Sequence, residues 1–439
     1  MSEDTQTMKP GTGREVGHTV PTRRRFAGPG RTVGALVGVL AVLGVGFAPS
    51  ATADDAQSKQ WYLEPMKADQ MWRVSTGEGV KVAVIDTGVN PDTPSLKGQV
   101  LTGEVPKTVA YKATDDFTGH GTTMAELIAG TGSGGGLKGL APGAKIVPYR
   151  VDLEGLPGGK SEEKKTPKIA QAIRAAADTD AKIISMSFGG YLYPEEEEAV
   201  KYAASKGKLL VAAVGNAGQS AKKDLIDYPA AYPYVVGVAA ADETGTVSKF
   251  SSSGGYVDLT APGQGFPGWC DTNFRSYCDR EGTSPATALA SAAAALIWSA
   301  HPDWTVNQVT RSLIDTAGRK WPKEKPSKYG GYGMIRPRLV LESAKFDAGP
   351  AHEDPLAKEN GGDLLAKAGT SAASNAPSPS ASTPSQAPAK GSAGSTSAAG
   401  SGAESSDGGN TLWIALGAVA AVLVIGGGGA AVMRARRAR

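Results

Sequence analysis

Cysteine and histidine are both scarce in this chain, which has two cysteines and four histidines among 439 residues. The cysteines, Cys270 and Cys278, lie eight positions apart with no other cysteine or histidine near them, so they do not form a typical set of metal ligands. We therefore expect neither a bound metal ion nor a cofactor. If this part of the chain is exported, a local disulfide is the preferred interpretation, and a pair of free thiols is the alternative.

A basic surface is also missing from the central part of the chain, although the formal net charge of the whole is +3. Residues 1–53 contribute +3 and residues 434–439 contribute +4, which leaves −4 for the segment between them. A nucleic-acid interface needs lysines and arginines gathered on a folded surface. We therefore expect no nucleic-acid partner.

Near each end of the chain there is an apolar run that contains no charged residue. At the N-terminal end, three arginines at residues 23–25 precede the run at 33–48, and the sequence Ala51-Thr52-Ala53 follows it. A basic segment, an apolar run and an A-x-A site are typical of a secretory signal peptide, which we place at residues 1–53. Residues 22–26 also resemble a twin-arginine signal, although an ordinary basic segment explains them as well.

At the other end, residues 411–433 are uncharged and long enough to cross a hydrocarbon core of about 30 Å as a helix. The arginine-rich residues 434–439 follow at once and indicate a cytoplasmic tail. The sequence therefore predicts a single-pass protein of the cell membrane whose main domain is extracytoplasmic. A cell-wall sorting signal is the alternative, but no LPxTG-like sequence precedes the run.

Between the two ends, the composition separates a folded domain from a tether. Residues 347–410 consist largely of alanine, serine, glycine, proline and threonine, which bury too little apolar surface to fold, so we expect a disordered tether there. Residues 80–346 alternate short apolar runs with helical patterns, which is typical of an α/β fold with a mostly parallel sheet flanked by helices. Strands are predicted at residues 80–85, 182–186, 208–214 and 234–239.

Two shorter segments adjoin this pattern. Residues 54–79 are too few to form an independently folded inhibitory domain, so we expect an N-terminal extension that packs on the main domain. Residues 153–167, rich in glycine and charged residues, are expected to form an exposed insertion. The apolar residues available for packing in the extension are Trp61, Leu63, Met66, Met71 and Trp72.

A histidine is the usual general base for a nucleophilic serine, and the small number of histidines limits which residue could take this role. Three of them lie in the predicted signal peptide, in the tether and in a turn after a helical pattern, which leaves His120. Hydrolysis of an amide by a serine needs a base for the hydroxyl proton and a carboxylate that orients this base. Asp86 ends a predicted strand, and His120 and Ser284 each begin a helical pattern. Because ligand sites of open α/β sheets lie beyond the carboxyl ends of the strands, we predict that these three residues form a catalytic triad.

The sequences around these residues resemble the subtilase family of serine proteases, in which Asp, His and Ser follow in this order. The motifs are Val-Ala-Val-Ile-Asp86-Thr-Gly, Gly-His120-Gly-Thr and Gly-Thr-Ser284-Pro-Ala. The resemblance covers about residues 75–345. It implies a subtilisin-like three-layer fold and a serine endopeptidase that cleaves proteins or peptides through an acyl-enzyme. One departure is Pro285, which subtilisin lacks after its serine; we expect it at the first helical position, where its missing N–H costs little.

The same resemblance implies further site residues. Asn216, in Gly-Asn216-Ala-Gly after a predicted strand, matches the asparagine that stabilises the oxyanion, with the backbone N–H of Ser284 as the second donor. An Asn-Gly-type turn is the alternative. Ser187, Phe188 and Gly189, within Ser-Met-Ser-Phe-Gly-Gly, match the strand edge that binds an extended substrate backbone.

The predicted signal peptide, short extension, tether, single C-terminal helix and basic tail together resemble the mycosins, the membrane-anchored proteases associated with type VII secretion. This resemblance implies cleavage of exported proteins and contact with a type VII secretion membrane complex. The sequence leaves two other functions open. One is a noncatalytic or dual-role protease-shaped scaffold that stabilises such a complex, and the other is a soluble degradative protease, which the predicted anchor disfavours.

Overall fold

The computed structural model describes residues 53–153, 155–220 and 226–361. The predicted signal peptide up to residue 52, the predicted tether from residue 362 onwards, the predicted transmembrane helix and the basic tail lie outside these ranges. Among the described residues, no helix combines the length and the apolar character that crossing a bilayer requires.

Six strands form the central sheet, and each pairs with its neighbours in parallel. They are β1 (Lys81–Asp86), β2 (Lys145–Arg150), β3 (Ile183–Met186), β4 (Leu209–Ala213), β5 (Val235–Ala241) and β6 (Leu259–Pro262). Their order across the sheet is β2-β1-β3-β4-β5-β6. Because a parallel sheet is covered on both faces, its strands are continuous apolar runs. The four predicted strands are confirmed as β1, β3, β4 and β5, with ends that differ by one or two residues.

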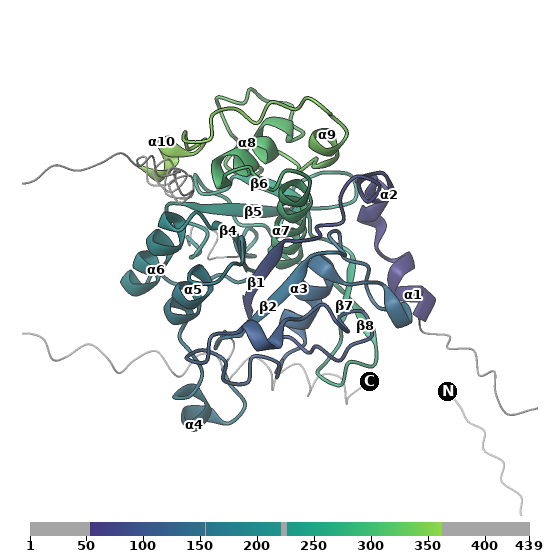
Figure 1. Ribbon diagram of the computed structural model, residues 1–439, viewed down its shortest axis with the longest axis vertical. Helices are drawn as coiled ribbons and strands as arrows, with labels where there is room; N and C mark the ends of the chain where they lie inside the picture. Colours follow the sequence, from purple (N-terminus) through teal and green to yellow (C-terminus); the bar gives the residue numbers. More distant parts are fainter. Residues whose placement is uncertain (1–52, 154, 221–225, 362–439) are drawn as a thin grey trace, which may run out of the picture. The chain divides into compact units, whose positions relative to one another are not determined.

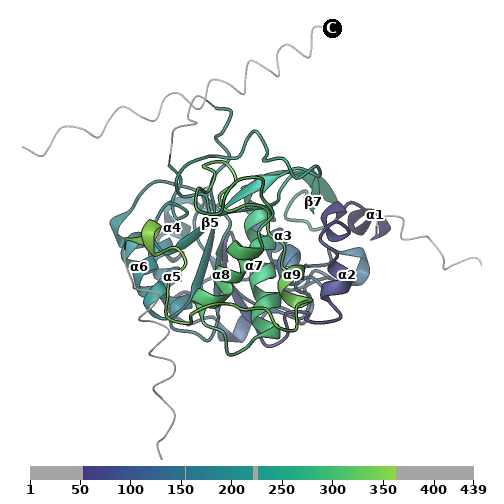
Figure 2. The same cartoon turned by 90° about the horizontal axis from the view of Figure 1, so that it is seen from above.

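Helices cover both faces of the sheet, so the domain has three layers (Figures 1 and 2). One face carries α5 (Ile169–Ala177) and α6 (Pro194–Ser205), and the other carries α3 (His120–Ala129) and α7 (Thr283–Ala300). Helix α8 (Val306–Thr316) packs against α7. The structure thus confirms the expected α/β architecture with a parallel sheet.

The segment before β1 contributes to the core of the domain. It contains α1 (Ala53–Ser58), the 3-10 helix η1 (Trp61–Leu63) and α2 (Ala68–Met71). Tyr62 and Met71 are fully buried in the same hydrophobic cluster as the sheet. Two indole N–H groups fix the segment further: Trp61 donates to the carbonyl of Gln264 at 3.0 Å, and Trp72 donates to the carbonyl of Leu140 at 2.9 Å.

The predicted insertion at residues 153–167 is anchored to the edge of the sheet. It contains the short helix α4 (Gly159–Glu163). Glu162 on this helix lies 2.8 Å from the guanidinium of Arg150, the buried last residue of β2, and 3.0 Å from the ammonium of Lys112. Hydrogen bonds from Arg150 and then from Lys112 lower the pKa of Glu162 to about 2.

The folded part of the chain extends beyond residue 346, where the composition places the start of the tether. Residues 347–361 include α10 (Ala357–Asn360), and Leu356 beside it is buried. The side-chain oxygen of Asn360 accepts a hydrogen bond from the backbone N–H of Tyr234 at 2.6 Å, just before β5. These few contacts hold a segment whose composition alone resembles a linker.

The two cysteines lie in a small antiparallel hairpin outside the central sheet. Its strands are β7 (Phe266–Trp269) and β8 (Tyr277–Arg280), which pair with each other. A disulfide joins Cys270 to Cys278 across the connecting loop. The chain therefore has the local disulfide that the spacing favours, and not a pair of free thiols.

This hairpin packs against α3, the helix that begins with His120. The backbone N–H of Trp269 donates to the hydroxyl of Thr123 at 3.0 Å, and the hydroxyl of Tyr277 donates to the carboxylate of Glu126 at 2.7 Å. Glu126 is fully buried and also accepts a hydrogen bond from Thr93 at 2.7 Å. Burial raises the pKa of Glu126 to about 7, although the hydrogen bonds from Thr93 and Tyr277 act in the opposite direction.

We expect Glu126 to make the stability of the domain depend on pH. Its pKa is higher in the folded protein than in the unfolded chain, so the folded state binds more protons between about pH 4.5 and pH 7, and the free energy of unfolding should fall as pH rises through this range by about 3 kcal/mol. Urea denaturation at several pH values would measure this. Glu126→Gln should lack this part of the pH dependence, whereas Glu64→Gln, at an exposed side chain, is the control. Equal pH profiles for the wild type and Glu126→Gln would contradict the prediction.

Candidate active site

Asp86 and His120 meet at the carboxyl end of the sheet. Asp86 is the last residue of β1 and is fully buried, and His120 is the first residue of α3. The Nδ1 atom of His120 lies 2.7 Å from Oδ1 of Asp86. A buried carboxylate in this position holds the imidazole in the tautomer with the proton on Nδ1 and leaves Nε2 to accept a proton.

The carboxylate of Asp86 is oriented by the next residue in the chain. The backbone N–H of Thr87 donates to the same Oδ1 atom at 2.8 Å. The Thr87 hydroxyl lies at the centre of a wider network, because it donates to Asp116 at 2.8 Å and accepts from the hydroxyl of Thr118 at 2.9 Å. It also accepts from the backbone N–H of Gly121 at 3.1 Å. The end of β1 and the start of α3 are thereby linked through one side chain.

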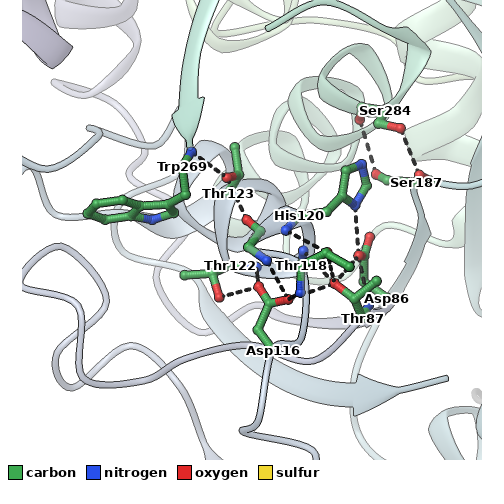
Figure 3. Close-up of polar contacts among 12 residues, drawn as sticks. Asp86, Thr87, Asp116, Thr118, His120, Thr122, Thr123, Ser187, Trp269 and Ser284 are labelled. Atoms are coloured by element: carbon green, nitrogen blue, oxygen red, sulfur yellow. Dashed lines mark hydrogen bonds and ion pairs between the residues drawn. The ribbon is translucent and has the colours of Figure 1, made fainter. Parts of the chain in front are cut away.

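Asp116, which the sequence analysis did not identify, fixes the first turn of α3 (Figure 3). One of its carboxylate oxygens accepts from the backbone N–H groups of Thr118 and Gly119 at 3.0 and 2.9 Å. The other accepts from the N–H and the hydroxyl of Thr122 at 2.8 and 2.6 Å. A carboxylate at a helix N-terminus satisfies N–H groups that have no helical acceptor and interacts favourably with the helix dipole. The sequence signal was an aspartate followed closely by threonine and glycine at the start of a helix.

Ser284 lies in the first turn of α7, beside the end of β3. Its hydroxyl donates to the carbonyl of Ser187 at 2.8 Å, and the hydroxyl of Ser187 donates to the carbonyl of Ser284 at 3.0 Å. In Figure 3, the imidazole of His120 lies between Asp86 and this pair of serines. The three predicted triad residues are therefore neighbours, although they are spread over nearly two hundred positions of the sequence.

The helix starts one residue before Ser284, at Thr283, which corrects the expected position of Pro285. Pro285 is the third residue of α7 and not the first. Its missing N–H is still among the first four of the helix, which have no helical acceptor, so no hydrogen bond of the helix is lost. Proline is therefore compatible with the third helical position, as it would be with the expected first position, because neither N–H has a helical acceptor.

Asn216 follows β4 and faces the same helix start. Its side-chain oxygen accepts from the backbone N–H of Thr283 at 2.9 Å and from the Thr283 hydroxyl at 3.1 Å. These contacts use the oxygen of the amide, so the NH₂ group is the part that remains to donate to a ligand. An Asn-Gly turn alone would not explain this contact with α7.

A cleft of about 410 Å³ lies over these groups. Its walls come from the start of α3, the end of β3, the disulfide hairpin and the start of α7. Residues from the predicted site that line it are His120, Ser187, Phe188, Gly189, Asn216 and Ser284. The structure thus brings these six residues to one concave surface, with Asp86 buried behind His120.

The geometry agrees with comparisons to known proteins. The model of the subtilase family matches residues 77–334, more than half of the chain, so this chain belongs to the subtilase family and is a subtilisin-like serine endopeptidase. It is 34% identical over 283 residues to thermitase from Thermoactinomyces vulgaris, covering 62% of this chain and 95% of thermitase. It is 34% identical over 268 residues to subtilisin Savinase from Lederbergia lenta, covering 60% of this chain and 92% of that protein.

Solved structures of mycosins resemble the described fold. The MycP3 protease of the type VII (ESX-3) secretion system is 28% identical with a TM-score of 0.52, and the alignment covers 66% of this chain and 88% of that one. MycP1 from Mycobacterium smegmatis is 26% identical with a TM-score of 0.54, with 69% of this chain and 88% of that chain covered. The likeness to mycosins that the sequence suggested is therefore confirmed.

We expect Asp116→Asn to lower kcat/KM about tenfold and the free energy of unfolding by about 2 kcal/mol, because an amide NH₂ cannot accept the two hydrogen bonds from Thr122 and the start of α3 then shifts. Peptide hydrolysis and urea denaturation would measure the two effects. Asp115→Asn is the matched control, since this neighbouring carboxylate only pairs with Lys112 at the surface. If both variants behave alike, Asp116 does not position the helix.

Proposed function

We propose that the chain cleaves peptide bonds with Ser284 as the nucleophile, His120 as the general base and Asp86 as the carboxylate that orients the imidazole. The observation that carries this proposal is the 2.7 Å contact between His120 and Asp86, with Ser284 beyond the opposite edge of the same ring. His120 takes the hydroxyl proton as the Ser284 oxygen attacks the scissile carbonyl carbon, and it then gives this proton to the leaving amine. Water hydrolyses the acyl-enzyme by the same proton transfers.

Two donors would stabilise the negative oxygen of the tetrahedral intermediate. One is the NH₂ group of Asn216, whose orientation is supported by the two hydrogen bonds that its oxygen accepts from Thr283. The other is the backbone N–H of Ser284, which lies in the first turn of α7 and needs no helical acceptor. Donors of this kind are effective because they are fixed before the charge develops.

The substrate backbone would lie along residues 187–189, which continue β3 past its carboxyl end. Ser187, Phe188 and Gly189 all line the cleft, and an extended peptide beside them would add a strand to this edge. The reciprocal hydrogen bonds between Ser187 and Ser284 keep this edge next to the nucleophile. The same strand edge therefore positions the substrate and the serine that attacks it.

A noncatalytic scaffold is the second candidate, and the hydrogen-bond network argues against it. A protein that only holds a complex together has no need to orient an imidazole against a fully buried carboxylate, because a buried charge is costly. Here Asp86, Thr87 and Asp116 form one connected network around His120. A dual role, with both catalysis and assembly, is compatible with the same geometry.

We propose further that the protein acts in type VII secretion at the outer side of the cell membrane. The fold likeness to MycP1 and MycP3 supports this, as do the predicted signal peptide at residues 1–53, transmembrane helix at 411–433 and basic tail at 434–439. In this arrangement residues 54–79 form an extension of the domain, and the tether that ends at residue 410 holds the domain near the membrane. The substrates would be exported proteins, and a secretion membrane complex would be the partner.

Ser284→Ala should abolish hydrolysis by roughly 10⁶-fold, the loss expected when the nucleophile of such a triad is removed. Asn216→Ala should lose about 10²- to 10³-fold, because one oxyanion donor remains. A serine-reactive phosphonate probe should label the wild type and Ser187→Ala but not Ser284→Ala, with labelling located by mass spectrometry. A wild-type protein that is folded yet neither labelled nor active would instead favour the scaffold.

The proposed topology can be tested with the full chain carrying a C-terminal tag. Protease added to cells without their wall should digest the main domain and spare the tag, because the arginine-rich tail lies in the cytoplasm. Immunoblotting of both ends gives the readout, and cells opened with detergent show that the tag is cleavable. Digestion of the tag in intact cells as readily as the main domain would mean that the orientation is reversed.

A further inference from the structure

Arg280 places a guanidinium in the wall of the candidate active-site cleft, and the mechanism above does not use it. It is the last residue of β8 in the disulfide hairpin, and it lines the cleft together with His120 and Ser284. Of the described residues that line this cleft, it is the only lysine or arginine. Arg280 is also exposed, so a permanent positive charge is accessible to a ligand in the cleft.

The guanidinium is held in place by the other strand of the hairpin. Its Nη2 atom donates to the carbonyls of Trp269 at 2.8 Å and of Cys270 at 3.0 Å, and the disulfide to Cys278 closes the loop next to these acceptors. The stem of Arg280 packs on β7 at Gly268, where a methyl group would lie 2.9 Å from its Cγ atom. The side chain is therefore positioned before a ligand binds, which lowers the entropic cost of binding.

The positive charge of Arg280 has no carboxylate partner in the part of the chain that the structure describes. Its two hydrogen bonds go to carbonyl groups and involve a single nitrogen, so Nε and Nη1 still have N–H groups to donate. The neighbouring Asp279 pairs with Lys59 instead, at 3.5 Å. Glu281 lines the same cleft but forms no ion pair with Arg280. A guanidinium in this state is complementary to a carboxylate of a ligand.

The stem of Arg280 lies close to the helix that carries His120. The methyl group considered at Gly268 would also lie 3.0 Å from Cγ2 of Thr123, so Arg280 and Thr123 flank the same point of the hairpin. Thr123 is on α3, three residues after His120, and it also lines the cleft. Arg280 therefore lies on the same side of the cleft as α3.

This is the side toward which the leaving half of a substrate would extend. In Figure 3, Trp269 of the hairpin and Ser187 lie on opposite sides of His120. In the proposed mechanism, the acyl half of the substrate lies along residues 187–189, and His120 gives its proton to the leaving amine. The residues after the scissile bond then run past His120 toward the hairpin, where Arg280 is the available cation.

We propose that Arg280 makes the enzyme favour aspartate or glutamate within the first two residues after the scissile bond. The inference rests on the proposed function, since it assigns part of the specificity of the same site. Because the guanidinium is exposed, the pairing is of moderate strength and is screened by salt. The carboxylate of Glu281 repels an acidic residue at the same place, so it limits the preference.

Peptide cleavage by the full chain in detergent tests this specificity. A panel of amidated fluorogenic peptides would be screened for one that is cleaved at a single bond, located by mass spectrometry. Versions with glutamate, glutamine or lysine at the first or second residue after this bond are then compared. We expect kcat/KM for glutamate to exceed that for glutamine about three- to fivefold at one of these positions, and less in about 0.5 M salt. Amidation excludes the terminal carboxylate as the source of the charge.

Substitutions in the hairpin assign the preference to one side chain. Arg280→Met keeps the apolar stem and should bring the ratio of glutamate to glutamine cleavage to one, whereas Arg280→Lys should keep part of the preference. Glu281→Gln should raise the ratio, because it removes the competing carboxylate. Arg275→Met, at an exposed arginine of the same hairpin that does not line the cleft, should keep the wild-type ratio. The ratio does not depend on how much active protein each variant yields.

A binding measurement separates this inference from the proposed catalysis. In fluorescence anisotropy, the Ser284→Ala protein should bind labelled glutamate peptides of the panel about three- to fivefold more tightly than the glutamine peptides, and adding Arg280→Met should remove the difference. If no peptide is cleaved and the phosphonate labels nothing, the proposed function fails, but Arg280-dependent binding still supports the carboxylate contact. Equal cleavage and binding of glutamate and glutamine peptides, or a preference that Arg280→Met leaves unchanged, would overturn the inference.

Discussion

The burial of one long helix of small side chains under the parallel sheet determines where the groups of the candidate active site lie. Helix α7 packs beneath β3, β4, β5 and β6 and beside α3, and its residues 285–298 are all buried. The hydroxyl of Ser291 donates to that of Ser185 in β3 at 3.0 Å, which fixes the helix along the strand. Because α7 begins beside the ends of β3 and β4, Ser284 contacts Ser187 there and Thr283 contacts Asn216, and α3 brings His120 alongside.

Three carboxylates near the cleft differ in how their oxygens are hydrogen-bonded and how deeply they are buried, and this difference sets what each can do. The carboxylate of Asp116 accepts hydrogen bonds from five groups, four of them on residues at the start of α3, so its role is to fix this helix end. Asp86 has all its contacts on one oxygen, including the one to His120. Glu126 accepts hydrogen bonds from two hydroxyls, but its complete burial outweighs them and favours the neutral form.

The sequence predicted the parts of the site that lie at strand and helix boundaries. Asp86, His120 and Ser284 could be placed together because the ends of parallel strands and the starts of the following helices gather on one edge of the sheet. Asp116 was not placed with them, because in the sequence it is an ordinary loop aspartate, and its role depends on the turn that wraps the N–H groups of Thr118, Gly119 and Thr122 around its carboxylate. The boundary at residue 346 was placed too early for a similar reason: the contact between Asn360 and Tyr234 spans more than a hundred residues, and composition does not record it.

The N-terminal segment also constrains the order in which the domain can fold. Its contacts are made with the last third of the domain: Trp61 reaches Gln264, the hydroxyl of Ser75 donates to the carbonyl of Leu296 at 2.7 Å, and Ser299 donates to Glu78 at 2.7 Å. Contacts of such large sequence separation form late and slowly. The N-terminal segment therefore cannot complete its packing until α7 has been synthesised, and its apolar side chains stay exposed until then.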